Sequence, residues 1–417
     1  MRPASVPSPA TLGLTRPTAA EDLSRLGWDN PESLELLWTL AATGDPDMAL
    51  NTLMRIIESA PEIGPAMRED ETFRVRLMAL LGGSSAFGDH LAAHPETWHE
   101  LQRPLPTPPE MLHTLLEEVG AEPATYAEPP VRSDTASPDL TSPGTYRAAP
   151  GDHKASLKVA YRTLMMRIAA HDLAGTFHSR KGQSRPQPRV GFREVTRLTT
   201  ALADASLTAA LAGAVRVVYG DEPLDAQLAV IAMGKCGAGE LNYISDVDVI
   251  FVGSEATPRI TRLASEFNRI GSACFFEVDA NLRPEGKSGA LVRTLDSHVA
   301  YYKRWAETWE FQAQLKARPQ TGYLPLGTDY LDKIDPMVWI ASQRESFVED
   351  VQAMRRRVLD NVPEDMRLRE LKLGEGGLRD VEFAVQLLQL VHGRSDESLR
   401  TLATVDALAA LVRAGYV

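Results

Sequence analysis

Extended-strand patterns occur in one short part of this 417-residue sequence, and helical patterns fill most of the rest. Aliphatic runs of strand length occupy residues 226–233, 247–252, 275–282 and 290–293. Before and after them, apolar residues recur at spacings of three and four, which predicts amphipathic helices. The pattern therefore predicts a mostly helical α+β protein, with one small mixed sheet flanked by N- and C-terminal helical bundles.

The chain is longer than a usual single domain, so several regions are expected, and composition indicates their bounds. Residues 1–20 are rich in Pro and Ala and are expected to be disordered, and a helical region is expected at 21–102. Residues 103–152 are rich in Pro, Ser, Thr and Gly, which predicts an insertion with at most one short helix. A core is expected at 153–325, followed by a helical region at 326–417. The chain ends directly on an apolar helical pattern, which predicts a truncated fragment of a longer chain.

The charge of the chain disfavours nucleic-acid and membrane partners. Its formal net charge is −12 at pH 7, whereas binding to nucleic acids or anionic membranes uses clusters of Lys and Arg. The two cysteines, Cys236 and Cys274, lie in apolar surroundings, which indicates a reduced, cytoplasmic protein without a disulfide framework. The N-terminus lacks the apolar segment of a signal peptide, and no apolar run is expected to reach the length of a membrane span.

A glycine-lysine turn precedes an acidic strand in the central stretch VIAMGKCGAGELNYISDVDVIFVGS, residues 230–254. Asp246 and Asp248 are two apart on the predicted strand, so their side chains share one face. Carboxylates this close raise each other's pKa, and a divalent cation relieves the repulsion. Asp279 lies on a second aliphatic strand and joins them if the two strands are neighbours. The three carboxylates predict a site for two Mg²⁺ ions, with Mn²⁺ as the alternative metal.

Groups that suit an anion surround these acidic residues in the sequence. Gly234 and Lys235 begin a turn whose backbone N–H groups and ammonium can face a phosphate. Ser245 directly precedes the acidic pair and can donate a hydrogen bond to a phosphate oxygen. Arg283 and Lys287 flank the third acid in a Pro-Gly loop and add positive charge. Together with the carboxylates, these residues predict a site for phosphoryl or nucleotidyl transfer.

Other features of the sequence have weaker interpretations. The EGKS at 285–288 lacks the earlier glycine of a P-loop, and GKCGAGE does not match the dinucleotide-binding GxGxxG pattern. Lys316 and Arg318 remain open between a site role and simple surface charge. Trp305 and Trp309 are interpreted as core residues rather than as a platform for a base.

Four segments in order resemble the glutamine synthetase adenylyltransferase family of the polymerase-β-type nucleotidyltransferase superfamily: MGKCGAGELNYISDVDVIF, EVDANLRPEGKSGALV, YYKRWAETWEFQAQLKAR and KLGEGGLRDVEFAVQLLQLVHG. Members of this family have two homologous nucleotidyltransferase halves, and residues 372–383 match a spelling that follows the core of the N-terminal half. The resemblance implies a polymerase-β-like core with adenylyl-removing activity. Such an enzyme removes AMP from a tyrosine of adenylylated glutamine synthetase by phosphorolysis, uses phosphate, releases ADP and reactivates the synthetase in nitrogen regulation.

The resemblance also implies site residues and partners. Asp246, Asp248 and Asp279 match the family's metal ligands. The sequence departs from the family at Cys236 and Ala238, where Leu and Gly are more frequent. The implied partners are glutamine synthetase, the C-terminal adenylyltransferase half of the same polypeptide and a PII-type signal protein.

Two alternative functions remain open at this point. The first is an adenylyltransferase that moves AMP from ATP to a protein tyrosine or a small molecule. The second is a non-enzymatic regulatory module that binds nucleotide or a signal protein. The presence of all three carboxylates disfavours the second alternative.

Overall fold

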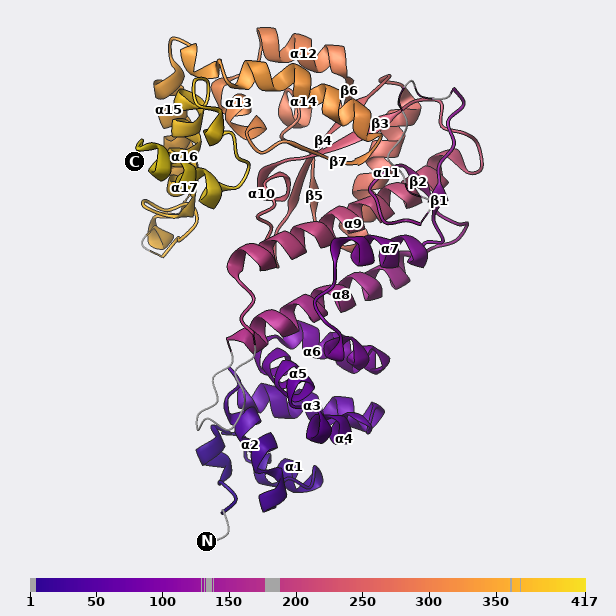
Figure 1. Ribbon diagram of the computed structural model, residues 1–417, viewed down its shortest axis with the longest axis vertical. Coiled ribbons are helices and arrows are strands. Elements are labelled where there is room, and N and C mark those ends of the chain that lie inside the picture. Colours follow the sequence, from indigo (N-terminus) through magenta and orange to yellow (C-terminus); the bar gives the residue numbers. More distant parts are fainter. Residues whose placement is uncertain are drawn as a thin grey trace. The chain divides into compact units, whose positions relative to one another are not determined.

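The computed structural model describes residues 5–128, 130, 132, 137, 139–176, 188–360, 362–367 and 369–417 (Figure 1). The chain forms two compact units, Met1–Met111 with Ala155–Leu202, and Leu112–Lys154 with Ala203–Val417. This division differs from the expected one: residues 155–202 of the expected core belong with the N-terminal helices, and residues 326–417 are not separated from the core. The mostly helical α+β fold class with a small mixed sheet is confirmed.

The first unit is helical throughout the part that the structure describes. Six helices lie wholly within it: α1 (Ala19–Arg25), α2 (Leu34–Ala41), α3 (Pro46–Ser59), α4 (Ile63–Glu69), α5 (Glu71–Gly83) and α6 (Ser85–Ala93). Three more cross from one unit to the other along the chain: α7 (Pro108–Glu118), α8 (Lys154–Gly175) and α9 (Phe192–Tyr219). Asp45, Asp70 and Ser84 begin α3, α5 and α6, because each side chain accepts a hydrogen bond from the backbone N–H three residues later.

The N-terminal stretch that was expected to be disordered is structured from residue 5 onward. A short 3₁₀-helix spans Pro9–Leu12, and the Leu12 side chain is fully buried. The Asp47 carboxylate accepts hydrogen bonds from the Thr15 N–H and hydroxyl at 2.9 and 2.6 Å. The expectation was wrong because it weighed the Pro- and Ala-rich composition and not the leucines, which are buried. The first four residues lie outside the described part.

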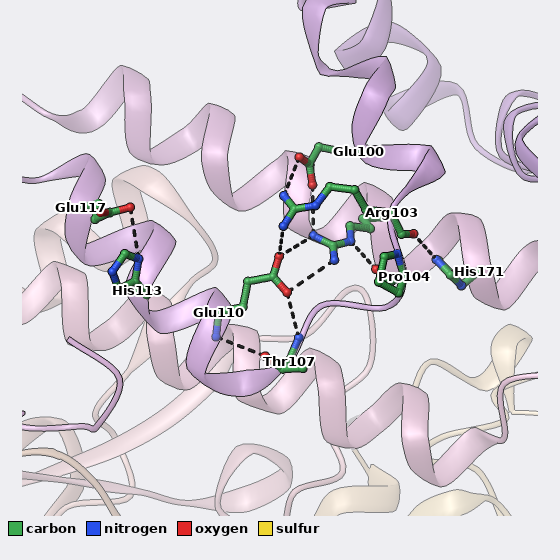
Figure 2. Close-up of polar contacts among 9 residues, drawn as sticks. Glu100, Arg103, Pro104, Thr107, Glu110, His113, Glu117 and His171 are labelled. Atoms are coloured by element: carbon green, nitrogen blue, oxygen red, sulfur yellow. Dashed lines mark hydrogen bonds and ion pairs between the residues drawn. The ribbon is translucent and has the colours of Figure 1, made fainter. Parts of the chain in front are cut away.

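A buried arginine fixes the beginning of the expected insertion onto α8 (Figure 2). The Arg167 side chain is 1% exposed, and its Nε donates to the Pro104 carbonyl at 2.6 Å. Its guanidinium also lies 3.1 Å from the Glu100 carboxylate and 2.8 Å from that of Glu110. Arg103 pairs with the same two carboxylates. The Pro-rich stretch therefore starts from a packed network of charges, all within the first unit.

The insertion contains one helix, as expected, and a small ribbon that was not expected. The helix is α7, and the ribbon is the antiparallel pair of β1 (Glu122–Pro123) and β2 (Tyr146–Arg147). Residues 129, 131, 133–136 and 138 of the expected insertion lie outside the described part.

The second unit contains the mixed sheet, with the order β5–β4–β3–β7 and with β6 also paired to β4. The strands are β3 (Leu228–Ala232), β4 (Val247–Gly253), β5 (Val278–Asp279), β6 (Val292–Thr294) and β7 (Arg318–Gly322). Strand β3 is antiparallel to β4 and β7, whereas β5 and β6 run parallel to β4. The four predicted strands are confirmed, although β5 is much shorter than expected. Strand β7 was missed, and the expectation that only helices follow the four predicted strands was wrong, because RPQTG carries no aliphatic run.

Helices that lie between and after these strands in the sequence complete the second unit. They are α10 (Gly234–Gly237), α11 (Pro258–Cys274), α12 (Leu295–Arg304), α13 (Thr308–Gln314), α14 (Leu324–Val338), α15 (Phe347–Asp360), α16 (Leu378–His392) and α17 (Thr404–Ala414). Ile231 and Ile250 of the sheet share one buried cluster with Phe311 of α13 and Tyr330 of α14. The ends of β3 and β4 are therefore held by a packed core.

Helix α9 is the one helix among the described residues that is long and apolar enough, by length and composition, to cross a membrane. Of the most apolar stretch of this helix, 67% is buried inside the protein. The expectation that no apolar run reaches this length was therefore wrong, and burial against the protein's own residues explains why this helix is apolar.

Candidate active site

The glycine turn begins where β3 ends and touches the acidic strand. The Met233 N–H donates to the Asp248 carbonyl at 2.8 Å, which continues the β3–β4 ladder to the start of the turn. Gly234 follows with φ +53°, a conformation that residues with a side chain rarely adopt. A Cβ at this position would lie 2.5 Å from Oδ2 of Asp248. The turn and the acidic strand therefore form a single site in which glycine is required.

Two of the predicted carboxylate residues are direct neighbours across a parallel strand pair. Asp248 of β4 and Asp279 of β5 are partners in the register, as are Val247 and Val278. The condition for bringing Asp279 close to the acidic pair, that these two strands are neighbours, is therefore met. Asp246 lies just before β4 and is exposed, whereas Asp248 is half-buried.

The charges of the site meet at Asp248. Burial raises the pKa of this carboxyl to about 6, and the negative charges of Asp246 and Asp279 act in the same direction. The positive charges of Arg379 and Lys372 lower it by less. Asp248 therefore shows the mutual repulsion that the spacing of the acidic residues predicts.

The carboxylates do not converge on one point with their side chains in these positions. No group of three or more His, Cys, Asp or Glu side chains in the described part of the chain is gathered as a metal site. Oδ1 of Asp279 instead accepts a hydrogen bond from the Asn281 N–H at 2.6 Å. Carboxylate oxygens that repel one another nevertheless have the donor chemistry that Mg²⁺ prefers. The metal role of Asp246, Asp248 and Asp279 stays a prediction.

A cavity of about 290 Å³ opens beside the turn and the acidic strand. Its lining contains five of the eight predicted site residues, namely Gly234, Lys235, Ser245, Asp246 and Asp248. It also contains Leu282, Trp309, Gln312, Ala313, Lys316, Met354, Lys372, Arg379, Glu382, Phe383 and Gln386. A larger cavity of about 600 Å³ in the same unit is lined by none of the predicted site residues. The smaller cavity is therefore the candidate active site, because it combines acidic, basic and apolar side chains around the glycine turn.

The other two predicted phosphate-binding cations are placed away from the cavity lining. The Arg283 guanidinium donates to the carbonyls of Ala280, Lys287 and Gly289 at 2.7, 3.1 and 3.1 Å. These bonds close the loop that follows β5. Lys287 itself is exposed on a one-turn 3₁₀-helix. Their phosphate-binding role stays a prediction, and the geometry gives Arg283 a loop-closing role.

The segment 372–383, whose role the sequence left open, contributes to this cavity. It places Lys372 and Arg379 in the lining, together with Glu382 and Phe383. The sequence signal for the cations was present, because KLGEGGLRD sets a lysine and an arginine on the two sides of a glycine-rich turn. These cations were not predicted because they lie far from the acidic strands in the sequence.

Lys316, which the sequence left open, is buried in the cavity wall and fully paired. Its ammonium lies 2.6 Å from Oε1 of Glu382 and 3.6 Å from Oε2 of Glu240. It also donates to the Thr404 hydroxyl at 3.0 Å. Lys316 therefore joins the turn after β3 to α16 and α17.

Arg318 supports the glycine turn from strand β7. Its guanidinium donates to the carbonyls of Cys236 and Gly237 at 3.1 and 3.3 Å and pairs with Asp204 at 2.9 Å. Burial raises the pKa of Asp204, and the positive charge of Arg318 opposes that rise. The missed strand β7 thus positions the main chain of the site.

The aromatic pair has two different environments. Trp305 is 74% exposed, so its interpretation as a core residue was wrong, whereas Trp309 is half-buried and lines the cavity. Near it, Gln312 is 4% exposed and donates through Nε2 to Oε1 of Gln386 at 2.7 Å. Oε1 of Gln312 is buried without a hydrogen-bond partner among the described residues. Because buried acceptors are normally paired, this oxygen is available to a ligand.

Comparison with known protein families gives two matches along the chain. Residues 152–332 match the glutamate-ammonia ligase adenylyltransferase family. Residues 352–417 match the GlnD PII-uridylyltransferase family. The first match contains the sheet and the turn, and the second contains the segment 372–383.

Curated relatives match almost the whole chain. The proteins of Corynebacterium efficiens, Nocardia farcinica and Mycobacterium tuberculosis H37Rv, each named bifunctional glutamine synthetase adenylyltransferase/adenylyl-removing enzyme, are 60%, 54% and 49% identical over 99% of this chain. The chain covers 41%, 40% and 39% of these relatives, so it spans about two fifths of their length. On this similarity and the matched motifs, the chain belongs to the family of glutamine synthetase adenylyltransferases/adenylyl-removing enzymes.

Proposed function

We propose that this chain carries the adenylyl-removing activity of its family. It would transfer AMP from a tyrosine of adenylylated glutamine synthetase to inorganic phosphate, which releases ADP and restores the active synthetase. The observation that carries the proposal is the cavity in which Asp246 and Asp248 lie together with Lys235, Lys372 and Arg379. The relatives' name contains both activities, and the spelling of residues 372–383 favours the removing half.

The reaction needs a site that accepts two anions at once. An oxygen of phosphate forms a bond to the adenylyl phosphorus, and the bond from phosphorus to the tyrosyl oxygen breaks with its electron pair on that oxygen. The phenolate then takes a proton from water. A phenol with a pKa of about 10 is a moderate leaving group. Fixed cations such as Lys235 fit this requirement, because they stabilise negative charge without having to reorganise.

The carboxylates give the site its proposed metal requirement. Asp246, Asp248 and Asp279 would hold Mg²⁺, with Mn²⁺ as the alternative, and such ions neutralise charge on the phosphates. The raised pKa of Asp248 shows that its charge is poorly compensated by the chain alone. A bound cation would relieve this repulsion, so we expect the cation to bind before the phosphate enters.

The remaining lining of the cavity fits a nucleobase. Trp309 and Phe383 supply aromatic surface, and Leu282 and Met354 supply aliphatic surface. The unpaired Oε1 of Gln312 can accept a hydrogen bond from the exocyclic amine of adenine. Adenine would thus satisfy an acceptor that has no partner among the residues the structure describes.

The test is mass spectrometry of adenylylated glutamine synthetase after incubation with this chain, Mg²⁺ and phosphate. We expect the synthetase to lose the mass of one adenylyl group, with ADP as the nucleotide product at a rate that depends on phosphate. Formation of AMP at a rate independent of phosphate would show that water is the nucleophile and would overturn the phosphorolysis.

The alternative is the reverse type of transfer, from ATP to unmodified glutamine synthetase. Incubation of the unmodified synthetase with labelled ATP and this chain tests it directly. Label on the synthetase, with no loss of AMP from the adenylylated form, would assign the adenylyltransferase activity to this chain instead. A PII-type signal protein and a C-terminal adenylyltransferase half are further proposed partners, supported by the family resemblance.

A further inference from the structure

We infer that Lys372 and Arg379 form the phosphate-binding side of the cavity and hold the phosphate group that becomes the β-phosphate of ADP. The inference rests on the proposed function for the direction of the reaction. The binding of a nucleoside diphosphate by these two residues can be tested separately.

The backbone of the segment brings the two cations together. The Arg379 N–H donates to the Lys372 carbonyl at 2.9 Å, and the Leu378 N–H donates to the Leu371 carbonyl at 2.9 Å. The glycine-rich turn therefore closes on itself, so Lys372 and the first turn of α16 are neighbours. Because these N–H groups are already bonded within the segment, the side chains and not the helix end provide the anion site.

A partly buried arginine anchors this turn. Arg355 of α15 donates to the carbonyls of Leu373 and Gly374 at 3.2 and 3.1 Å and forms an ion pair with Asp380. The Asp380 carboxylate in turn accepts a hydrogen bond from the Gly376 N–H at 2.7 Å. The turn is thus fixed at both of its ends, which suits a site that must be organised before its ligand arrives.

The charges in the cavity leave these two cations available. Lys316 is compensated by Glu240 and Glu382, at 3.6 and 2.6 Å. Arg379 contacts Glu382 only at 3.4 Å, and in the described part of the chain no carboxylate lies within 4.0 Å of the Lys372 ammonium. A phosphate group would therefore supply the negative charge that Lys372 and Arg379 lack.

The arrangement differs from the one expected from sequence proximity. The Arg283 guanidinium already donates to three carbonyls of its own loop, and Lys287 does not line the cavity. Lys372 and Arg379 do line it, beside Asp246 and Asp248. The two sets of cations therefore make opposite predictions about which substitution weakens phosphate binding.

The experiment is calorimetric titration of the chain with ADP and Mg²⁺, and with adenosine as a ligand without phosphate. We expect Lys372→Gln and Arg379→Gln each to weaken ADP binding by about tenfold, the range for a lost hydrogen bond to a charged group. Adenosine binding should stay unchanged, and Lys372→Arg should retain ADP binding. Arg367→Gln removes an exposed cation of the same region that does not line the cavity, and it should behave as the unchanged chain.

Three results would overturn the inference. These are an unchanged chain that does not bind ADP, variants that bind ADP normally, and variants that lose adenosine and ADP binding equally, because the last would show damage to the whole cavity. In the assay with adenylylated synthetase, the two Gln variants should raise the KM for phosphate by about tenfold with a smaller change in kcat. If ADP binding depends on both residues but no phosphate-dependent ADP forms, their role in binding the nucleoside diphosphate stands and the proposed function fails.

Discussion

The surroundings of Asp248 disfavour a charged carboxylate when no cation is bound. It is next to Gly234 in space, is paired with Asp279 across the strands, and has Asp246 two positions away. Its pKa of about 6 means that the folded protein holds the charged form at a disadvantage relative to the unfolded chain. A residue that destabilises the empty protein is understandable if it acts on a bound ligand.

Asp248→Asn should separate these two effects. Since the folded pKa lies above the ordinary 3.8, the charged carboxylate destabilises the fold above pH 6, and this penalty grows as pH rises from about 3.8 to about 6. Removing the charge should raise the free energy of unfolding at pH 7.5 by about 1–3 kcal/mol in the presence of a chelator. Urea unfolding measures this change. Adenylyl removal with Mg²⁺ should fall more than about 100-fold, beyond the usual effect of a residue that only orients a metal ligand. Activity close to that of the unchanged chain would exclude Asp248 from the mechanism.

Gln312→Met should affect the base and not the phosphates. The thioether fills similar space but offers only a weak acceptor in place of the unpaired amide oxygen, so ADP affinity should fall about fivefold, as for one neutral hydrogen bond of about 1 kcal/mol. Calorimetry can compare ADP with the diphosphate of a purine nucleoside that lacks the exocyclic amine. We expect the amine-free ligand to bind the unchanged chain and the variant equally. An equal loss for both ligands would mean that Gln312 supports the shape of the cavity instead.

At the scale of elements, the turn from β3 into α10 places the candidate active site at the end of an inner strand of the sheet. Gly234 has φ +53° and approaches the Asp248 carboxylate. Gly239, later in the same loop, has φ +72° with no atom within 4 Å of an added Cβ. The two glycines therefore share a left-handed backbone conformation but differ in whether an added side chain would strike the acidic residue.

Gly234→Ala should cost more than Gly239→Ala. Both should lose about 1–2 kcal/mol of stability from the left-handed conformation. Only Gly234→Ala should also displace the Asp248 carboxylate and lower kcat by at least about tenfold. Thermal unfolding and steady-state kinetics on the pair measure the two effects. Equal kinetics in the two variants would show that close packing of Gly234 on Asp248 does not matter for the reaction.

Strand β7 supports the same turn through Arg318, which invites a double-mutant test. Arg318→Met leaves the partly buried Asp204 carboxylate without its arginine partner and should destabilise the protein by about 1–3 kcal/mol. Asp204→Asn combined with Arg318→Met removes the uncompensated charge and should recover a large part of that loss. Denaturant unfolding of the two single variants and the double variant gives the coupling energy. Additive losses would show that the 2.9 Å ion pair contributes little.

Local patterns explain which elements could be predicted from the sequence. Strands β3 and β4 are aliphatic runs with a glycine turn between them, and Asp248 lies beside Asp279 because the two predicted acidic strands are adjacent. Strand β7 could not be predicted, because RPQTG becomes a strand through its pairing with β3 rather than through its own composition. The cations of residues 372–383 could not be assigned either, because their closeness to β4 depends on packing between elements more than a hundred residues apart. The placement of Trp305 in the core was wrong because its spacing of four from Trp309 is meaningful only within one continuous helix, whereas α12 ends at Arg304 and Trp309 lies on α13.

At the scale of the whole molecule, each unit contains a buried group whose charge state matters for folding. In the first unit, Arg167 is held by Glu100 and Glu110, so its burial is compensated. In the second, His298 is 1% exposed beneath β4 and packs edge-on against Tyr330 at 5.2 Å. Its Nε2 lies 3.3 Å from the Phe251 carbonyl, and its Nδ1 is buried without a partner among the described residues. The surroundings of His298 therefore favour the neutral imidazole, which carries one ring proton, over the doubly protonated imidazolium.

The pH dependence of stability should reveal this histidine. Burial lowers the pKa of His298 to about 4, the hydrogen bond to the Phe251 carbonyl opposes this by less, and the charge of Arg293 lowers it slightly further. The folded pKa lies below the ordinary 6.5, so the unfolded chain binds the proton first as pH falls. The free energy of unfolding should therefore decrease between about pH 7 and pH 4, by about 2 kcal/mol at pH 5 from this residue. Asp248 opposes the trend, because its raised pKa favours the folded form as pH falls below 6.

His298→Phe keeps an aromatic ring but cannot take a proton, so its stability difference between pH 7 and pH 5 should be about 2 kcal/mol smaller than that of the chain with histidine. Urea unfolding of both proteins at the two pH values, in the Asp248→Asn background to remove the opposing titration, measures this difference. Equal pH dependence in both would mean that His298 accepts its second proton in the folded protein, through a rearrangement that gives Nδ1 a partner.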